Sequence, residues 1–440
     1  MKKFFTTLKN IWSITELRDK ILITLGFLVI YRLGSFIVLP GIDANIINDP
    51  ARKAEGLLGL LDAFSGGAFH NASIFGLGIM PYISASIVIQ LLTVAMPYFQ
   101  KMQKEGESGR KRINQITRVL TIFICLSQSI AYIKGTIPQE AIVINSTIFL
   151  FLSMIILTSG TIFCMWLGEK ITDKGIGNGI SMLIMIGIIS SLPTQLFAEM
   201  ASKGLSGLLL FILELVALFF VIMAVVALTQ AVRKIPVQYA KQIVGNKVYG
   251  GQRQYIPLKV NSAGVMPIIF AQALMFIPGM LGNYFADKNE FLANMGFAFA
   301  SFTSPAYNIL LATLIIVFTF FYTAITINPT QIADDMKRNG GFVPGIKPGK
   351  QTSEFIDGIL TKITLPGSVF LAIVAILPAF AVIAGVTQGF ATFYGGTSLL
   401  IMVGVILDTL QQIESYLLMR HYEGMMKSGK IKGRSQVAMA

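Results

Sequence analysis

Residues 64–100 read FSGGAFHNASIFGLGIMPYISASIVIQLLTVAMPYFQ, and this stretch decides the fold. It holds no Asp, Glu, Lys or Arg, and it is longer than the ~20 apolar residues that a membrane-spanning helix needs. A Gly-rich, polar opening precedes an apolar run that contains Pro81. A proline inside a span removes a backbone hydrogen bond that lipid cannot replace. The pattern predicts a half-length re-entrant segment, followed by a helix that faces something other than lipid.

The composition of the whole chain is that of a multispanning helical membrane protein. Of its 440 residues 54% are hydrophobic and 13% charged, against roughly a quarter charged in soluble domains. Residues 1–20 are mixed polar and basic, without the apolar core of a cleavable signal peptide. The two cysteines, Cys125 and Cys164, lie in apolar runs and are expected to be inert packing residues. The chain has only two cysteines and two histidines, and they are far apart in the sequence, so we expect no metal site. We also expect no cofactor.

We expect ten spans, preceded at residues 1–20 by an amphipathic, cytoplasmic helix lying at the membrane interface. Their expected positions are 21–39, a second span ending near 96, 119–132, 142–167, a fifth ending near 192, 205–228, 263–285, 308–327, 363–384 and 398–418. Long polar loops occupy residues 230–261 and 328–362, and a short basic loop occupies 101–118. In the first long loop, alternating residues on either side of Gly250-Gly251 predict a hairpin. A basic tail follows at 419–440.

The distribution of basic residues gives the orientation. With ten spans, 29 of the 35 Lys and Arg residues fall on the side that holds both termini. Only Arg52, Lys53, Lys134, Lys203 and Lys288 fall on the other side, and Arg32 lies within a span. By the positive-inside rule both termini are cytoplasmic.

The ten spans divide into two halves of five, residues 21–192 and 205–418, so the second half must run inverted relative to the first. Both halves carry a proline in their second span, Pro81 and Pro267. Inverted repeats with broken helices are typical of proteins whose pathway lies between the halves.

Candidate chemistry within the spans is sparse. The intramembrane charges Arg32, Glu214, Asp408 and Glu414 suggest no shared site, and helix–helix or subunit contacts are the favoured interpretation. The GIGNG stretch at 175–179 follows no strand and lacks the Lys-Ser/Thr pair of a phosphate loop, so tight packing at a helix start is favoured. No nucleophile–base set can be assembled. The sequence therefore does not indicate an enzyme.

Isoleucines recur beside helix-breaking residues within the spans. They are Ile83, Ile87, Ile180, Ile184, Ile269 and Ile401. On the pattern alone, ordinary packing explains them. The functional alternative is a hydrophobic constriction that seals a pore by dewetting.

Long motifs along nearly the whole chain closely resemble the SecY family of protein-conducting channels. They are RLGSFIVLPGID, FSGGAFHNASIFGLGIMPYISASIVIQLL, KEGESGRKRINQITR, MWLGEKITDKGIGNGIS, QYAKQIVGNKVYGGQ, LKVNSAGVMP, GGFVPGIKPGKQT and YGGTSLLI. The resemblance implies an all-α membrane protein, with ten transmembrane helices in two inverted, pseudo-symmetric halves and a re-entrant plug helix at about 60–71.

The resemblance also implies roles for particular residues. The plug would include Leu61, Phe64, Ser65, Gly66, Gly67, Phe69 and His70. The six isoleucines would form the pore ring. Spans two and three would part from spans seven and eight as a lateral gate. Polar residues beside that gate would tune its opening, with structural packing as the alternative for each: Gln90, Thr93, Gln128 and Asn178.

The two long loops would dock the motor ATPase SecA and the ribosome, since basic groups suit the phosphates of ribosomal RNA. The docking candidates are Lys241, Lys247, Arg253, Arg338, Lys347 and Lys350. Lys347 replaces an arginine common in the family, which keeps the charge but loses bidentate geometry. Asn246-Lys247 stands where the family often has two arginines. An ordinary solvated charge remains the alternative for Lys347.

The resulting hypothesis is the pore-forming subunit of a translocase in the bacterial cytoplasmic (inner) membrane. It would move unfolded secretory polypeptides across the bilayer and release membrane-protein helices sideways into lipid. It would perform no covalent chemistry. SecE, SecG, SecA, the ribosome, signal sequences and the lipid bilayer would be its partners. A secondary transporter with inverted repeats is the alternative, and it would need a polar solute-binding site at mid-membrane.

Overall fold

The computed structural model describes residues 12–43, 46, 65–204, 207–239, 242–244, 247–249, 253–272, 274–275, 298–299, 301 and 303–427. The chain divides into two compact units. The first is Met1–Ser191 with Gly404–Ala440, and the second is Leu192–Val403. Two long helices, α9 and α17, contribute to both units. Whether the two units correspond to the predicted inverted halves, residues 21–192 and 205–418, stays a prediction.

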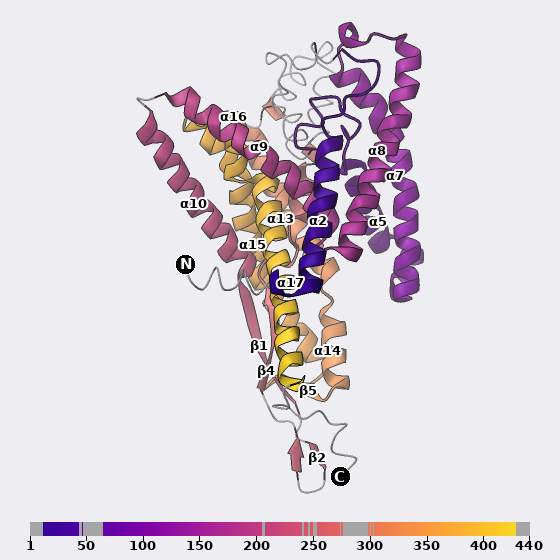
Figure 1. The fold of residues 1–440 in the computed structure, drawn as a ribbon. Coiled ribbons are helices and arrows are strands. Elements are labelled where there is room, and N and C mark those ends of the chain that lie inside the picture. Colours follow the sequence, from indigo (N-terminus) through magenta and orange to yellow (C-terminus); the bar gives the residue numbers. More distant parts are fainter. Residues whose placement is uncertain are drawn as a thin grey trace. The chain divides into compact units, whose positions relative to one another are not determined.

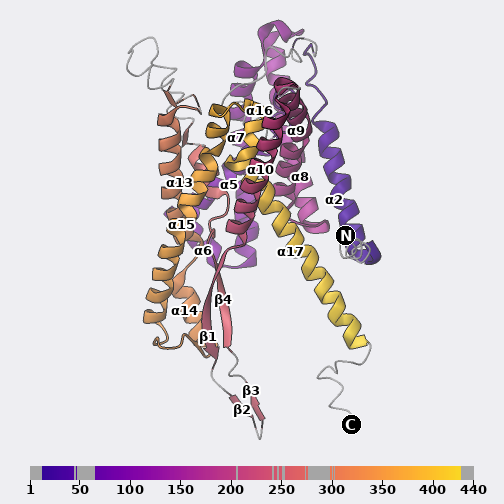
Figure 2. The same ribbon diagram turned by 90° about the vertical axis from the view of Figure 1, so that its left-hand side faces the viewer.

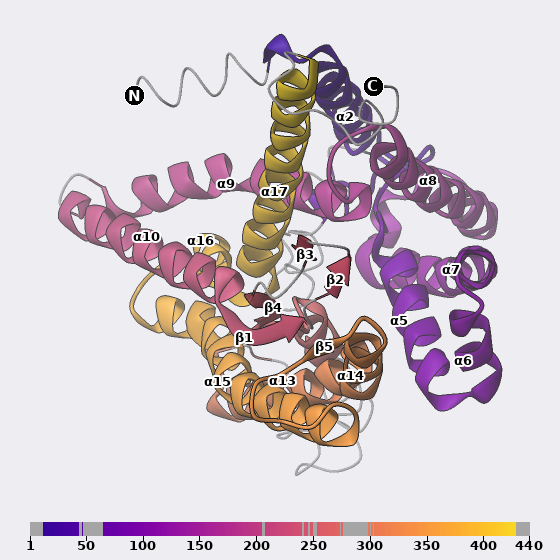
Figure 3. The ribbon, with the colours of Figure 1, turned by 90° about the horizontal axis from the view of Figure 1, so that it is seen from below.

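The first unit is a bundle of long helices. Its elements are α2 (Thr15–Gly34), α5 (Met80–Ala95), α6 (Pro97–Lys104), α7 (Glu107–Thr136), η2 (Gln139–Ala141), α8 (Ser146–Lys174), and parts of α9 (Gly179–Lys203) and α17 (Gly396–Lys427). Helix α7 packs against both α5 and α8, and α2 packs against α8 (Figure 1). Seen from below, α5, α6 and α7 lie side by side (Figure 3).

The second unit joins helices to two small sheets. Its elements are α10 (Leu208–Gln230), β1 (Val232–Tyr239), β2 (Gln242–Val244), β3 (Lys247–Tyr249), β4 (Arg253–Lys259), α13 (Pro305–Thr326), α14 (Pro329–Arg338), β5 (Gly341–Phe342), α15 (Lys350–Ile383), α16 (Gln388–Ala391) and η3 (Thr392–Tyr394). One sheet has three strands in the order β4-β1-β5, and the other has two strands, β2-β3. Helices α13 and α15 lie side by side, and α14 packs on the first part of α15 (Figure 2).

Seven helices within the described residues are long and apolar enough to span a membrane, and the bent pair α5 and α6 makes an eighth candidate. Helix α2, the predicted first span, is not among them because its 20 residues carry five charges. The predicted seventh span, 263–285, lies partly outside the described residues, which end within it at residue 275. The observed helices are consistent with the predicted ten.

The second span begins where the proline predicts an interruption. Residues 66–79 form turns and a single bridge, and helix α5 starts only at Met80. Pro81 lies in the first turn of α5, where a helix has no use for its missing N–H. Residues 66–79 therefore enter the bundle as irregular chain before the helix starts, and residues 66–71, the part of the predicted plug helix that lies here, form turns instead of a helix.

Two sequence expectations need correction. Residues 101–118 are not a loop, because α6 extends to Lys104 and α7 begins at Glu107. The predicted hairpin exists, with β1 antiparallel to β4 and β2 antiparallel to β3. Its chain reversal falls between Val244 and Lys247, which pair with each other, and not at Gly250-Gly251.

Candidate functional site: the re-entrant segment and the isoleucines

The re-entrant segment, which we define as residues 65–79, is held by backbone hydrogen bonds to the chain that follows α2. The N–H of Leu39 donates to the carbonyl of Ala72, and the N–H of Ile74 donates to the carbonyl of Ile37, both at 2.9 Å. Backbone groups inside a membrane protein need such internal partners because lipid offers none. Irregular chain is tolerated here for that reason.

Arg32 of α2 reaches the first turn of this segment. Its Nη1 donates to the carbonyl oxygen of Gly66 at 2.5 Å and to the Ser35 hydroxyl at 3.3 Å. Gly66 has a φ of +66°, which favours glycine. The sequence favoured helix–helix or subunit contacts for Arg32, and the contact observed is instead with the backbone of the irregular segment.

Tyr132 of α7 binds the segment at Phe69, three residues after Gly66. Its hydroxyl donates to the carbonyl of Phe69 at 2.6 Å, and the two rings meet edge to face with centroids 4.7 Å apart. Both side chains are buried. The sequence analysis missed Tyr132, since a tyrosine near the end of a span is common.

Aromatic rings pack the middle of the segment between α2 and α8. Phe75 stacks on Tyr31 with ring centroids 5.9 Å apart, and on Phe163 with centroids 5.8 Å apart. Glycine makes the close approach to α8 possible, because a Cβ at Gly160 would lie 2.3 Å from the carbonyl oxygen of Ile74. The segment is therefore enclosed on several sides.

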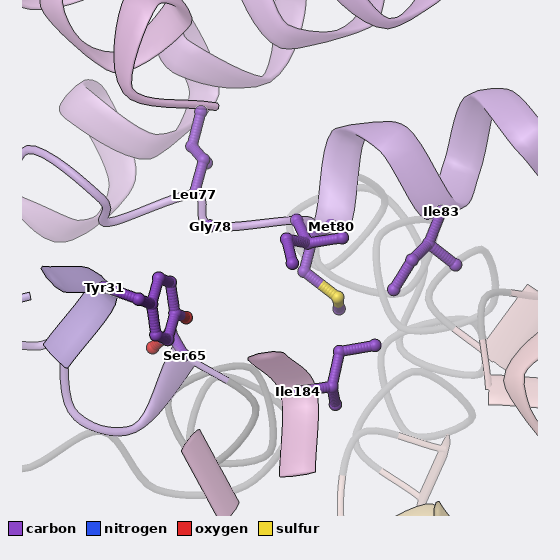
Figure 4. A pocket seen from close by; sticks show the side chains of 8 residues that line it. Tyr31, Ser65, Leu77, Gly78, Met80, Ile83 and Ile184 are labelled. Atoms are coloured by element: carbon purple, nitrogen blue, oxygen red, sulfur yellow. The ribbon is translucent and has the colours of Figure 1, made fainter. Parts of the chain in front are cut away.

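A narrow pocket lies between this segment and two of the predicted ring isoleucines (Figure 4). Met80 and Ile83 of α5 and Ile184 of α9 converge on it, with Tyr31 and Ser65 also lining it. Leu77, Gly78 and Ile79 complete the lining. Its free volume of about 10 Å³ is room for roughly one water molecule. Ile83 and Ile184 thus face a common space beside both ends of the re-entrant segment.

The remaining predicted ring isoleucines lie in both units. Ile87 and Ile180 are half-buried in the first unit, while Ile269 and Ile401 belong to the second, where Ile401 is 6% exposed. A ring that brings all six together stays a prediction.

The predicted gate residues have varied surroundings. Asn178 caps α9, because its side-chain oxygen accepts from the N–H groups of Ile180 and Ser181 at 3.2 and 3.3 Å. Thr93 donates to the carbonyl of Gln90 at 2.6 Å, and both are half-buried, as is Gln128. A helix cap is a structural role, and gate tuning stays a prediction for all four residues.

The GIGNG stretch packs tightly, as its sequence predicted. A Cβ at Gly179 would lie 1.9 Å from the carbonyl oxygen of Gly168. Side-chain oxygens accept from three of its N–H groups: Thr24 from Ile176 at 3.0 Å, Gln412 from Gly177 at 2.8 Å and Thr172 from Gly179 at 2.9 Å. N–H groups occupied in this way are not offered to a phosphate.

The other predicted plug and docking residues are placed as follows. Gly67 and His70 are half-buried in the re-entrant segment, whereas Leu61 and Phe64 lie outside the described residues, as does Lys241. Lys247 lies in β3 and Arg253 begins β4. Arg338 ends α14, Lys350 begins α15, and Lys347 lies in the loop between them, all three exposed.

A buried charge cluster in the second unit escaped the sequence analysis in part. Lys203 of α9 pairs with Glu214 of α10 at 2.8 Å and with Glu199 at 3.5 Å. Glu199 also accepts from the backbone N–H of Thr387 at 2.9 Å, and Tyr394 donates to the carbonyl of Glu214 at 2.7 Å. The predicted contact role of Glu214 is confirmed. Its partners lie up to 180 residues away and left no local signal.

This architecture defines a class of protein, the multispanning helical membrane proteins. A solved structure described as that of a protein conducting channel matches the chain with a TM-score of 0.61 at 18% identity, over 90% of this chain and 92% of that one. A second, whose description states that the plug domain of SecY stabilises the closed state and maintains a membrane seal, matches with a TM-score of 0.59 at 17% identity, over 90% and 92%. The predicted fold class is confirmed.

The family follows from the sequence comparisons. The SecY family model matches residues 73–410. The protein translocase subunit SecY of Vibrio cholerae is 41% identical over 431 residues, which cover 96% of each chain. The chain belongs to the SecY family, as its motifs predicted.

Proposed function

We propose that the chain is the pore-forming subunit of a protein-conducting channel, with the re-entrant segment as its plug. The observation that carries the proposal is the anchorage of residues 65–79 inside the helix bundle of the first unit. Arg32 and Tyr132 bind its backbone, and Ile83 and Ile184 line the pocket beside its two ends. A segment held by a few hydrogen bonds, beside apolar side chains, suits a removable closure.

The apolar residues suit a pore that carries polypeptide. A constriction of isoleucines excludes ions by dewetting and offers a moving chain no lasting hydrogen bond. In this proposal the six isoleucines Ile83, Ile87, Ile180, Ile184, Ile269 and Ile401 surround the polypeptide. Unfolded secretory chains pass through, and membrane-protein helices leave sideways between spans two and three and spans seven and eight. Gln90, Thr93, Gln128 and Asn178 tune that exit.

The energy for transport comes from partners in this proposal, since the subunit performs no covalent chemistry. SecE and SecG complete the complex, and SecA and the ribosome dock on the cytoplasmic loops. The exposed Arg338, Lys347 and Lys350 support the docking role, because basic side chains attract phosphate and acidic surfaces. In this proposal both termini lie in the cytoplasm of a bacterial cell and the spans in its inner membrane, which the excess of basic residues on one side supports.

Ion conductance tests the proposal. The full-length protein and a deletion of residues 60–71 are reconstituted into planar bilayers, and single-channel currents are recorded. We expect a sealed wild type and a leaky, flickering deletion. Negligible current from both proteins, with solute uptake into vesicles that hold the wild type, would instead support a secondary transporter.

A further inference from the structure

Arg32 is a charged residue in the first predicted span, and one of its contacts reaches the re-entrant segment, beside contacts to Ser35 and Phe36. Its guanidinium donates to the Gly66 carbonyl at 2.5 Å and lies 4.8 Å from the centroid of the Phe36 ring. Among the ion pairs within the described residues, none includes Arg32. Arginine within a span is expensive unless polar groups surround it. A backbone carbonyl of the re-entrant segment supplies much of that compensation here.

Gly66 fits a slot between two helices. A Cβ at this position would lie 2.8 Å from Arg32 Nη1, from the Cα of Gly187 and from the Ser190 hydroxyl oxygen. Gly187 and Ser190 belong to α9. Because Gly66 is buried and has positive φ, any larger residue would push the segment away from Arg32.

We propose that Arg32 is a latch, a positioning residue that holds the re-entrant segment in its closed place through the Gly66 carbonyl. This inference rests on the proposed function of that segment as a plug. The bond exists only while the segment is docked. When the segment leaves, water replaces the carbonyl. A contact made in one state alone shifts the balance between the two states.

The strength of the latch follows from its chemistry. A hydrogen bond from a charged donor is about twice as strong as a neutral one. Its loss is expected to raise the ratio of open to closed channels about 10- to 150-fold. Lysine keeps the charge and one donor but loses the planar fork of arginine. Arg32→Lys is therefore expected to retain part of the seal.

The test compares three variants with a matched control. Arg32→Met removes the donor, Arg32→Lys preserves part of it, and Gly66→Ala displaces the acceptor while Arg32 stays. The control is Arg118→Met, which removes an arginine bonded to Glu169 at 2.7 Å, with no contact to the segment. Open probability in planar bilayers and thermal unfolding of the full-length protein are measured for each. A deletion of residues 65–71 reports whether the segment closes the pore.

The latch predicts a graded series of leaks. Arg32→Met and Gly66→Ala conduct most, Arg32→Lys conducts less, and Arg118→Met stays sealed. If Arg32→Met does not fold, Gly66→Ala still tests the contact. Sealed Arg32→Met and Gly66→Ala channels beside a leaky deletion would overturn the latch and leave the plug intact. A deletion that stays sealed would overturn the plug, and the latch with it.

Discussion

Tyr132 offers a sharp test of how the re-entrant segment is held, because one atom can be removed cleanly. Its hydroxyl is buried and donates to the Phe69 carbonyl at 2.6 Å, while its ring packs on Phe69. Tyr132→Phe deletes the hydroxyl and preserves the ring. The Phe69 carbonyl then loses this donor, with almost no change in packing volume.

The structure sets the magnitude of the effect. Losing one hydrogen bond costs about 0.5–1.5 kcal/mol, and the Phe69 carbonyl keeps a longer bond from the Ala72 N–H at 3.4 Å. That cost falls on the docked state alone, since both groups meet water once the segment is displaced. The ratio of displaced to docked segment should therefore rise about 2- to 12-fold.

Single-channel recording measures that ratio, and a matched substitution controls for general destabilisation. Tyr394→Phe breaks a bond of the same type, from a buried tyrosine hydroxyl to the Glu214 carbonyl at 2.7 Å, but in the second unit. Both variants should lower the unfolding temperature, and only Tyr132→Phe should open the channel more often. Equal open probability in Tyr132→Phe and wild type would refute the reasoning, as would an equal increase in both variants.

Four further single substitutions test other parts of the fold. Gly179→Ala should destabilise the protein by about 1–3 kcal/mol or more, because its Cβ would overlap the Gly168 carbonyl at 1.9 Å. Gly26→Ala, which meets no atom within 4 Å, should be neutral or stabilising by up to ~1 kcal/mol in the same thermal assay. Lys203→Met should lower the free energy of unfolding by about 3–5 kcal/mol, because it leaves Glu199 and Glu214 buried without their cation. Adding Glu214→Gln to this variant should recover part of the lost stability. Additive losses from the two substitutions would contradict the pairing. Asn328→Ala should cost about 0.5–2 kcal/mol by removing the cap of α14, visible as faster hydrogen exchange in α14 while α15 is unchanged.

Much of the fold was predictable because bilayers impose simple constraints. Long apolar runs separated by charged loops located most spans, and Pro81 marked where the second helix begins. Boundaries were less predictable when charged residues continued a helix into the cytoplasm. Helix α7 starts at Glu107 because charged side chains do not oppose helix formation in water.

The contacts of the candidate site were less predictable, since they join residues far apart in the chain. Arg32 was visible as a charge in a span, but its partner is a backbone carbonyl 34 residues away, and carbonyls have no sequence signal. Glu214 was visible for the same reason, since it is also a charged residue within a predicted span. Lys203 was assigned to a loop, although its side chain lies within the helix bundle and is 14% exposed. The residue types predicted which groups need partners, but only the structure identified those partners.

The anchorage of the re-entrant segment explains how a closure inside a membrane protein is both firm and removable. Apolar packing alone does little to favour the docked segment over one displaced into lipid, because lipid is as apolar as the protein interior. The segment is also held by donors that grip its backbone: Arg32 at Gly66, Leu39 at Ala72 and Tyr132 at Phe69. Water in an open pore can replace each of these bonds, whereas the apolar contacts of Phe69 and Phe75 are lost on release. In the proposed plug role, those contacts set most of the cost of moving the segment, and the exchanged hydrogen bonds add little to it.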